Sequence, residues 1–179
     1  MNTVTSKNPY GALQLETLVE FEQKLGLPLP DTYREYLLAF NGGKYEKDVI
    51  TISDAEGETS IHHMYGLHAG PRHAQLRNKR TIAGNLFLDI CDDSVGNQFI
   101  LRLTGGEAGA IYFLDHEVPP EEGLTALAGD FNEFVAKMRS DDEFMQEFAD
   151  RDPEGYRAFR ERLEQLKRKY DEEFKDRQE

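Results

Sequence analysis

The sequence predicts an α+β fold, in which a curved, mostly antiparallel sheet packs against N- and C-terminal helices and a long C-terminal helix follows. Three observations favour it. Apolar residues recur at helical spacing near both ends of the chain, the middle holds short apolar runs rich in β-branched and aromatic residues, and short polar turns separate those runs. Such short connections indicate antiparallel pairing, because parallel neighbours need a crossover of a dozen or more residues.

Two helices are predicted at the N-terminus. Apolar residues between 13 and 25 recur at mostly helical spacing, and Gly26 can end that helix. Pro30 or Asp31 opens the second helix, and residues 41–43 (Asn-Gly-Gly) end it because they tolerate positive φ. Its apolar stripe stands at i, i+3, i+4 and i+7, and we expect it in the core: Tyr33, Tyr36, Leu37 and Phe40.

The middle of the chain is predicted to be sheet. Runs of β-branched, aromatic and leucine residues mark the strands, and clusters of Asp, Gly, Asn and Ser mark the turns between them. The predicted strands are residues 49–52, 61–67, 86–90, 98–103 and 110–114, with a short helix over 71–78.

Helices are predicted again at the C-terminus, over residues 131–138, 144–148 and 153–179. The last one carries a heptad-like apolar stripe on an otherwise charged rod. We therefore divide the chain into a domain of residues 1–150 and a charged helical extension of residues 151–179. Because the stripe can pack on its own domain, we expect a monomer rather than a homodimer.

The charge of the chain is acidic and unevenly distributed. The net charge is −13, and residues 153–179 contain eight basic and eight acidic residues, so residues 1–152 carry all of it. A field of this sign repels nucleic acid and anionic membranes and attracts basic proteins. The exception is a small basic island, which we expect to pair with the acidic loops: Arg72, Arg77, Lys79 and Arg80.

Cytoplasmic location is expected from what the sequence lacks. The polar N-terminus does not resemble a secretory signal, and no apolar run approaches the roughly 18–20 residues that span a bilayer. Cys91 is the single cysteine, which leaves no partner for an intramolecular disulfide.

No catalytic, cofactor-binding or metal-binding motif is recognisable. Phosphate-binding glycine loops and serine nucleophile elbows are missing, and Cys91 at the end of an apolar strand is typical of a small buried hydrophobe. On a regular strand, His62 and His63 point to opposite faces and cannot chelate together. The Asp92-Asp93 pair lacks the ligand spacing of a calcium loop and is typical of a turn. We therefore expect a binding protein without cofactor or metal, and not an enzyme.

Three blocks of the sequence resemble a known family. Residues 25–37 read Leu-Gly-Leu-Pro-Leu-Pro-Asp-Thr-Tyr-Arg-Glu-Tyr-Leu, and residues 40–43 read Phe-Asn-Gly-Gly. In the second block, residues 86–117, an Asp-Asp-x-x-Gly-Asn turn precedes Ile-Tyr-Phe-Leu-Asp-His-Glu. The third begins at Leu127-Ala128 and continues with Phe-Asn-Glu-Phe at 131–134. In this order and spacing they resemble the SUKH superfamily, named partly for the Smi/Knr regulator of fungal cell-wall synthesis.

The resemblance implies a protein-interaction function. Bacterial members of the superfamily are immunity proteins, which bind and neutralise a cognate toxin of a polymorphic or contact-dependent system. Many of these toxins are nucleases, and a basic nuclease domain would suit an acidic inhibitor. The alternative is a regulatory or scaffold module of the Smi/Knr type. Partner-binding residues should be acidic and on exposed loops, and the candidates are Asp54, Glu56, Glu58, Asp92, Asp93, Glu117, Glu121 and Glu122.

Overall fold

The computed structural model describes residues 2–175, which form two compact units. The first unit ends at Ser140 and holds the sheet and three α-helices, and the second begins at Asp141 and holds two helices. The boundary predicted at residue 150 falls near the end of the first of these two helices. The structure therefore groups that helix with the C-terminal one.

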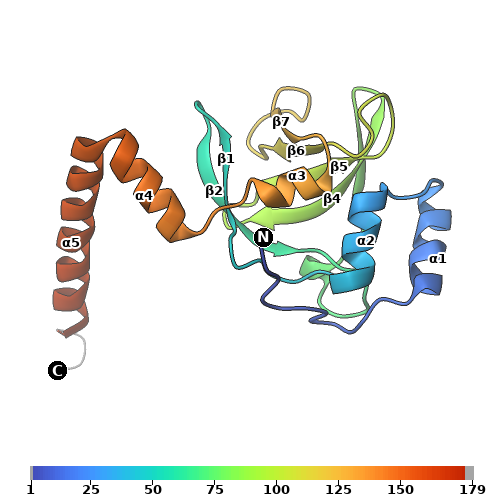
Figure 1. Ribbon diagram of the computed structural model, residues 1–179, viewed down its shortest axis with the longest axis horizontal. Helices are drawn as coiled ribbons and strands as arrows, with labels where there is room; N and C mark the ends of the chain where they lie inside the picture. The colour runs from blue at the N-terminus through green and yellow to red at the C-terminus, as the bar shows by residue number, and fades with distance from the viewer. Residues whose placement is uncertain (1, 176–179) are drawn as a thin grey trace. The chain divides into compact units, whose positions relative to one another are not determined.

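The elements of the first unit follow the predicted α+β order (Figure 1). Its helices are α1 (Leu15–Leu25), α2 (Asp31–Phe40), the short 3-10 helix η1 (Arg72–Ala74) and α3 (Phe131–Ala136). Its strands are β1 (Val49–Ser53), β2 (Gly57–Met64), β3 (Lys79–Ile82), β4 (Asn85–Asp93), β5 (Gln98–Arg102), β6 (Ile111–Leu114) and β7 (Leu124–Ala128).

Helices α1 and α2 begin and end as their capping residues dictate. Gly26 closes α1 at φ 89°, and its N–H donates to the carbonyl of Glu22. Asn41 closes α2 in the left-handed region at φ 45°. The carboxylate of Glu22 then joins the two helices, because its Oε1 accepts from the Leu29 N–H at 2.9 Å and from Arg34 Nε at 3.1 Å.

The seven strands form one open antiparallel sheet in the order β1-β2-β4-β5-β6-β7. The long strand β4 organises it. One edge of β4 pairs with β5, and the other edge pairs with β3 along residues 85–88 and with β2 along residues 91–93. The register shifts by one residue between Ile61 and His63, where β2 meets β4. The predicted α+β class with an antiparallel sheet is confirmed.

The two faces of the sheet carry separate apolar clusters. The larger cluster contains Leu88, Phe99 and Leu101 from the sheet and is covered by α1, α2 and α3. The smaller contains Phe87 and Ile100 and lies on the other face, as expected from the alternation of side chains along a strand. Burying apolar area stabilises a fold by about 25 cal/mol for each Å². The larger cluster is therefore the main source of stability.

Two residues of this core have particular consequences. Phe40, expected to be a fully buried part of the α2 stripe, is only half-buried, whereas Leu37 is completely inaccessible. Cys91 is also completely inaccessible, at the point where β4 meets β2 and β5. Burial raises the pKa of its thiol well above the ordinary value.

Strands β3 and β7 were not predicted. Strand β7 has the sequence Leu-Thr-Ala-Leu-Ala, whose leucines and alanines favour helix, but pairing with β6 overrides that preference. Strand β3 is short and mostly polar, and only η1 forms where a helix over 71–78 was expected. Arg80 of β3 pairs with the buried Asp89 of β4, and not with an acidic loop.

The second unit is a pair of helices, α4 (Asp141–Arg151) and α5 (Pro153–Lys175). Phe148 of α4 contacts the rings of Tyr156 and Phe159 on α5. Further along α5, Leu163 and Leu166 of the heptad-like stripe are exposed. The side chains of its next two members, Tyr170 and Phe174, lie outside the described part of the structure. The same holds for residues 176–179, the end of the predicted helix. Within residues 2–175, none of the helices has the length and apolar character that crossing a membrane requires.

Candidate functional site

Two adjoining hollows open on the surface where the β1–β2 hairpin, the β4–β5 turn and the β6–β7 loop meet. The larger has a volume of about 510 Å³ and the smaller about 210 Å³, and both are lined by Glu56, Phe113 and Asp115. We call the joined hollows the acidic groove. Six carboxylate side chains line it, and they are Glu56, Glu58, Asp93, Asp115, Glu117 and Glu122.

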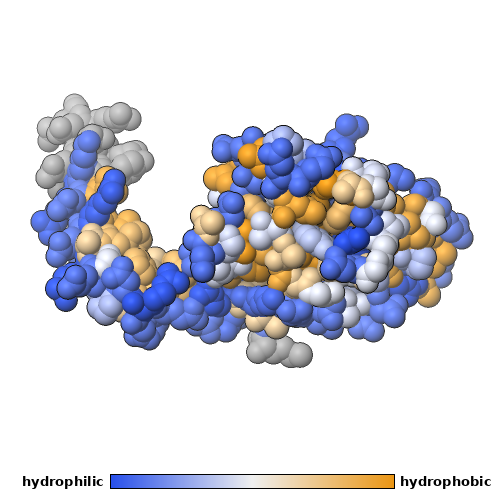
Figure 2. All heavy atoms as spheres, turned by 90° about the horizontal axis from the view of Figure 1, so that it is seen from above, coloured by the Kyte–Doolittle hydropathy of each residue, from blue (hydrophilic) through white to orange (hydrophobic). Residues whose placement is uncertain are grey.

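Apolar groups lie among these carboxylates. The ring of Phe113 forms part of the lining of both hollows, and two valines of the surrounding loops are exposed, Val95 by 67% and Val118 by 40%. Figure 1 shows the β1–β2 hairpin and the β6–β7 loop pointing upward, and Figure 2, seen from above, shows hydrophobic surface between hydrophilic groups there. Such a mixture suits a protein partner, since apolar contacts anchor and charges orient.

Asp93 is the buried residue of the lining that holds the groove together. This residue is only 3% exposed, and its Oδ1 accepts hydrogen bonds from the N–H groups of Val95, Gly96 and Asn97 in the β4–β5 turn. Its Oδ2 accepts from the Thr59 hydroxyl of β2 at 3.0 Å and from the Asn97 amide at 2.9 Å. One carboxylate therefore fixes the turn and ties it to β2.

The network continues to the β6–β7 loop through Asn97. The Oδ1 of Asn97 accepts from Nδ1 of His116 at 2.7 Å and from its backbone N–H. The loop then closes on itself, because the Asp115 N–H donates to the carbonyl of Gly123 at 3.0 Å. Gly123 is required there, since a Cβ would lie 2.7 Å from the Val118 side chain and 2.9 Å from the Asp115 carbonyl oxygen. The groove is thus pre-organised by a hydrogen-bond network centred on the buried Asp93.

The electrostatic character of the groove follows from its lining. Among the described residues, no lysine or arginine lines either hollow, so the six carboxylates have no lysine or arginine beside them within the lining. Glu56, Glu117 and Glu122 are exposed, whereas Glu58 and Asp115 are half-buried. A cationic surface that approached the groove would find carboxylate acceptors already in place.

The structure brings most of the eight sequence-predicted binding residues together. Five of them line the groove, and they are Glu56, Glu58, Asp93, Glu117 and Glu122. The exposed residues Asp54 and Glu121 lie in the same hairpin turn and loop but line neither hollow. Asp93 is the buried member of this set, and Asp92 lines neither hollow.

The sequence did not identify Asp115 and Phe113, although both line the two hollows. Asp115 follows β6 directly, two residues before the candidate Glu117, so its position at a strand end could have been a signal. Phe113 was predicted only as part of the strand over 110–114, and it lies in the larger apolar cluster. Only the shape of the loops reveals that its edge reaches the surface.

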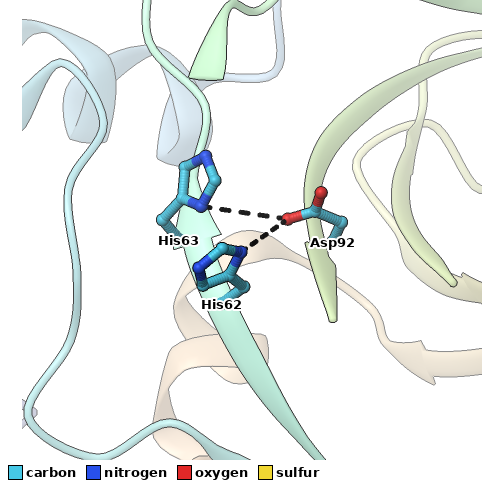
Figure 3. A group of neighbouring side chains, drawn as sticks. All are labelled: His62, His63 and Asp92. Atoms are coloured by element: carbon cyan, nitrogen blue, oxygen red, sulfur yellow. Dashed lines mark ion pairs between the residues drawn. The ribbon is translucent and has the colours of Figure 1, made fainter. Parts of the chain in front are cut away.

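The histidine pair on β2 differs from its prediction. His62 and His63 were expected on opposite faces of a regular strand. The register shift between Ile61 and His63 places both of them against Asp92 on β4, because a β-bulge sets two residues opposite one. Nδ1 of His62 lies 4.0 Å and Nδ1 of His63 lies 3.9 Å from Oδ1 of Asp92. Figure 3 shows both rings beside the Asp92 carboxylate.

A large apolar hollow was also unforeseen. It has a volume of about 510 Å³ and lies beside α2 and α3, with Tyr36, Phe40 and Val135 in its lining. The half-exposure of Phe40 arises because its ring faces this hollow rather than the closed core. The hollow lacks the carboxylates that the acidic groove presents, apart from Glu35.

The comparisons with known proteins agree with this architecture. A search of curated proteins found no match. The model of the SMI1/KNR4 family (SUKH-1) matches residues 12–137, a range that includes every residue of the acidic groove and excludes α4 and α5. That match extends over most of the chain, and the chain belongs to the SMI1/KNR4 family (SUKH-1).

Proposed function

We propose that this protein is an immunity protein, which acts in the cytoplasm as a monomer and neutralises a cognate toxin by binding it at the acidic groove. Domains of the SUKH family generally serve as binding modules, often in toxin immunity. The observation that carries the proposal is the arrangement of six carboxylates, held by the hydrogen-bond network of the buried Asp93, in a lining without lysine or arginine among the described residues.

A basic nuclease domain is the partner that this chemistry fits best. Nucleases present cationic surfaces because they bind phosphates, and a row of fixed carboxylates can occupy such a surface in place of nucleic acid. Val95 and Val118 would supply apolar contact at the centre, where binding energy concentrates. The exposed glutamates would chiefly speed association.

The groove is tested by removing its charge without changing its shape. In the first variant, Glu56→Gln, Glu117→Gln and Glu122→Gln are combined. The matched control carries the same change of three charges on exposed residues of α5, as Glu154→Gln, Glu161→Gln and Glu164→Gln. Association with the toxin encoded beside this gene is measured by surface plasmon resonance at several salt concentrations.

We expect the groove variant to associate roughly tenfold more slowly at low salt and the control to change by less than about twofold. The difference should shrink at physiological ionic strength, where the Debye length is about 8 Å. Equal slowing in both variants would show that net charge acts without the groove. If the chain neither binds the neighbouring toxin nor protects cells that express it, the immunity proposal fails and a regulatory or scaffold module of the Smi/Knr type takes its place.

A further inference from the structure

The bulge in β2 gathers three metal-ligating side chains at a place separate from the acidic groove. His62, His63 and Asp92 each offer one ligand atom, and these three atoms lie within 4.8 Å of one another (Figure 3). Neither imidazole reaches Asp92 Oδ1 with a hydrogen bond, since the separations are 4.0 and 3.9 Å. That oxygen is buried and has no hydrogen-bond partner among the described residues.

The arrangement is what a bridging cation would stabilise. A buried carboxylate oxygen is costly without a partner, and here two imidazole nitrogens face it just beyond hydrogen-bond distance. In a tetrahedral zinc site with bonds of about 2.0–2.1 Å, the ligand atoms are roughly 3.3 Å apart. Closing the present separations to that value requires shifts of about an ångström, shared between the two imidazole rings and the Asp92 carboxylate.

The donor set of the cluster also suits a metal. Two nitrogen donors and one carboxylate favour first-row transition metals such as Zn²⁺ over Mg²⁺ and Ca²⁺, which prefer oxygen.

The cluster is accessible from solvent. His62 and His63 line a hollow of about 250 Å³, and its other walls include Tyr10, Lys44 and His73. The ring of His73 lies 5.7 Å from that of His63, centroid to centroid, which makes it the next imidazole along the hollow. A metal held by three protein ligands would therefore keep a coordination position that faces the hollow.

We propose that His62, His63 and Asp92 form a binding site for one divalent transition-metal cation of the zinc class, with both Nδ1 atoms and Asp92 Oδ1 as ligands. The site joins β2 to β4, so metal binding links the two strands that also carry Glu58 and Asp93 to the acidic groove. The extensive apolar core provides stability without the ion.

The test uses the full-length chain without an affinity tag, freed of metal with EDTA. Zn²⁺ is titrated by isothermal calorimetry, Co²⁺ by visible absorption, and Mg²⁺ serves as the oxygen-preferring comparison. The variants are His62→Ala and Asp92→Asn, and the matched control is His116→Gln, which removes an exposed histidine beside the acidic groove. Circular dichroism confirms that each variant is folded, and the half-exposed His62 can be replaced without opening the core.

We expect one Zn²⁺ per chain and no binding of Mg²⁺. The visible absorption of bound Co²⁺ should be intense, which indicates a low coordination number. His62→Ala and Asp92→Asn should each weaken Zn²⁺ binding by at least about tenfold, and His116→Gln by less than about twofold. The proposal is overturned if Zn²⁺ shows no saturable binding, if Mg²⁺ binds equally well, or if His116→Gln weakens binding as much as the cluster variants do. These readouts need no toxin, so they are independent of the proposed function.

Discussion

The buried Asp93 carboxylate should be one of the most sensitive positions of the domain. Replacing it with alanine leaves five hydrogen-bond donors without their acceptor, three of them backbone N–H groups of the β4–β5 turn. A hydrogen bond to a charged group contributes about 1.5–3 kcal/mol. Because Val95 and Gly96 are exposed, their N–H groups can turn to water, and the five contributions will not add fully.

We therefore expect Asp93→Ala to lower the free energy of unfolding by about 3 kcal/mol. For a chain of this size, each kcal/mol lowers the melting temperature by roughly 2–4 °C. Asp93→Asn keeps one acceptor oxygen and should lose about half as much. Asp54→Ala, an exposed aspartate of the β1–β2 turn, is the control and should stay within about 0.5 kcal/mol of the parent.

The measurement is urea unfolding followed by near-ultraviolet circular dichroism, since Tyr33 and Tyr36 are buried in the domain and the chain has no tryptophan. If Asp93→Ala lost less than about 1 kcal/mol, or no more than Asp54→Ala, the hydrogen-bond network would not be holding the turn. The groove would then owe its shape to the loop 115–123 alone.

Three further predictions concern stability and are measured by the same unfolding experiment. Leu37→Ala should lower the free energy of unfolding by about 2–5 kcal/mol because Leu37 is fully buried. Phe40→Ala should lower it by less, because the Phe40 ring borders an open hollow. The reverse order would contradict the core assignment. Gly43→Ala should prevent normal folding, since its Cβ would lie 1.9 Å from the Ser6 carbonyl oxygen. At Gly26 a Cβ meets no atom within 4 Å, so Gly26→Ala should cost only about 1 kcal/mol, which is the strain of the left-handed conformation. Similar losses in the two variants would refute this distinction. A chain that ends at Ser140 should keep the unfolding midpoint of the domain, because it retains the whole first unit, and a large decrease would show that α4 and α5 support it.

The sequence predicts those parts of the fold that local chemistry decides. Gly26 and Asn41 end their helices by adopting positive φ, which few other residue types tolerate. Strands β4, β5 and β6 were predicted because their apolar residues form short runs separated by turns. Strand β7 was not, because its helix-favouring residues become a strand only through pairing with β6.

The candidate sites divide in the same way. Most acidic residues of the groove, such as Glu56 and Glu117, were predicted because their charge and the turn chemistry around them favour exposed positions, whereas Asp115 was not. Their grouping around Phe113 depends on how three loops meet, which is a long-range property. The proposed metal site was missed because a regular alternation was assumed for His62 and His63, whereas the one-residue bulge arises from the register between β2 and β4.

The inaccessible Cys91 gives each molecule a single built-in reporter of sheet opening. Its thiol is the only one in the chain and lies where β4 meets its neighbours, so an alkylating reagent can reach it only after those strands separate. The raised pKa keeps it protonated, and therefore unreactive, until then. The slow rate of alkylation in native buffer, compared with the fast rate in urea, consequently measures how often the sheet opens. Any ligand that holds β2 on β4 should prolong the lifetime of the free thiol.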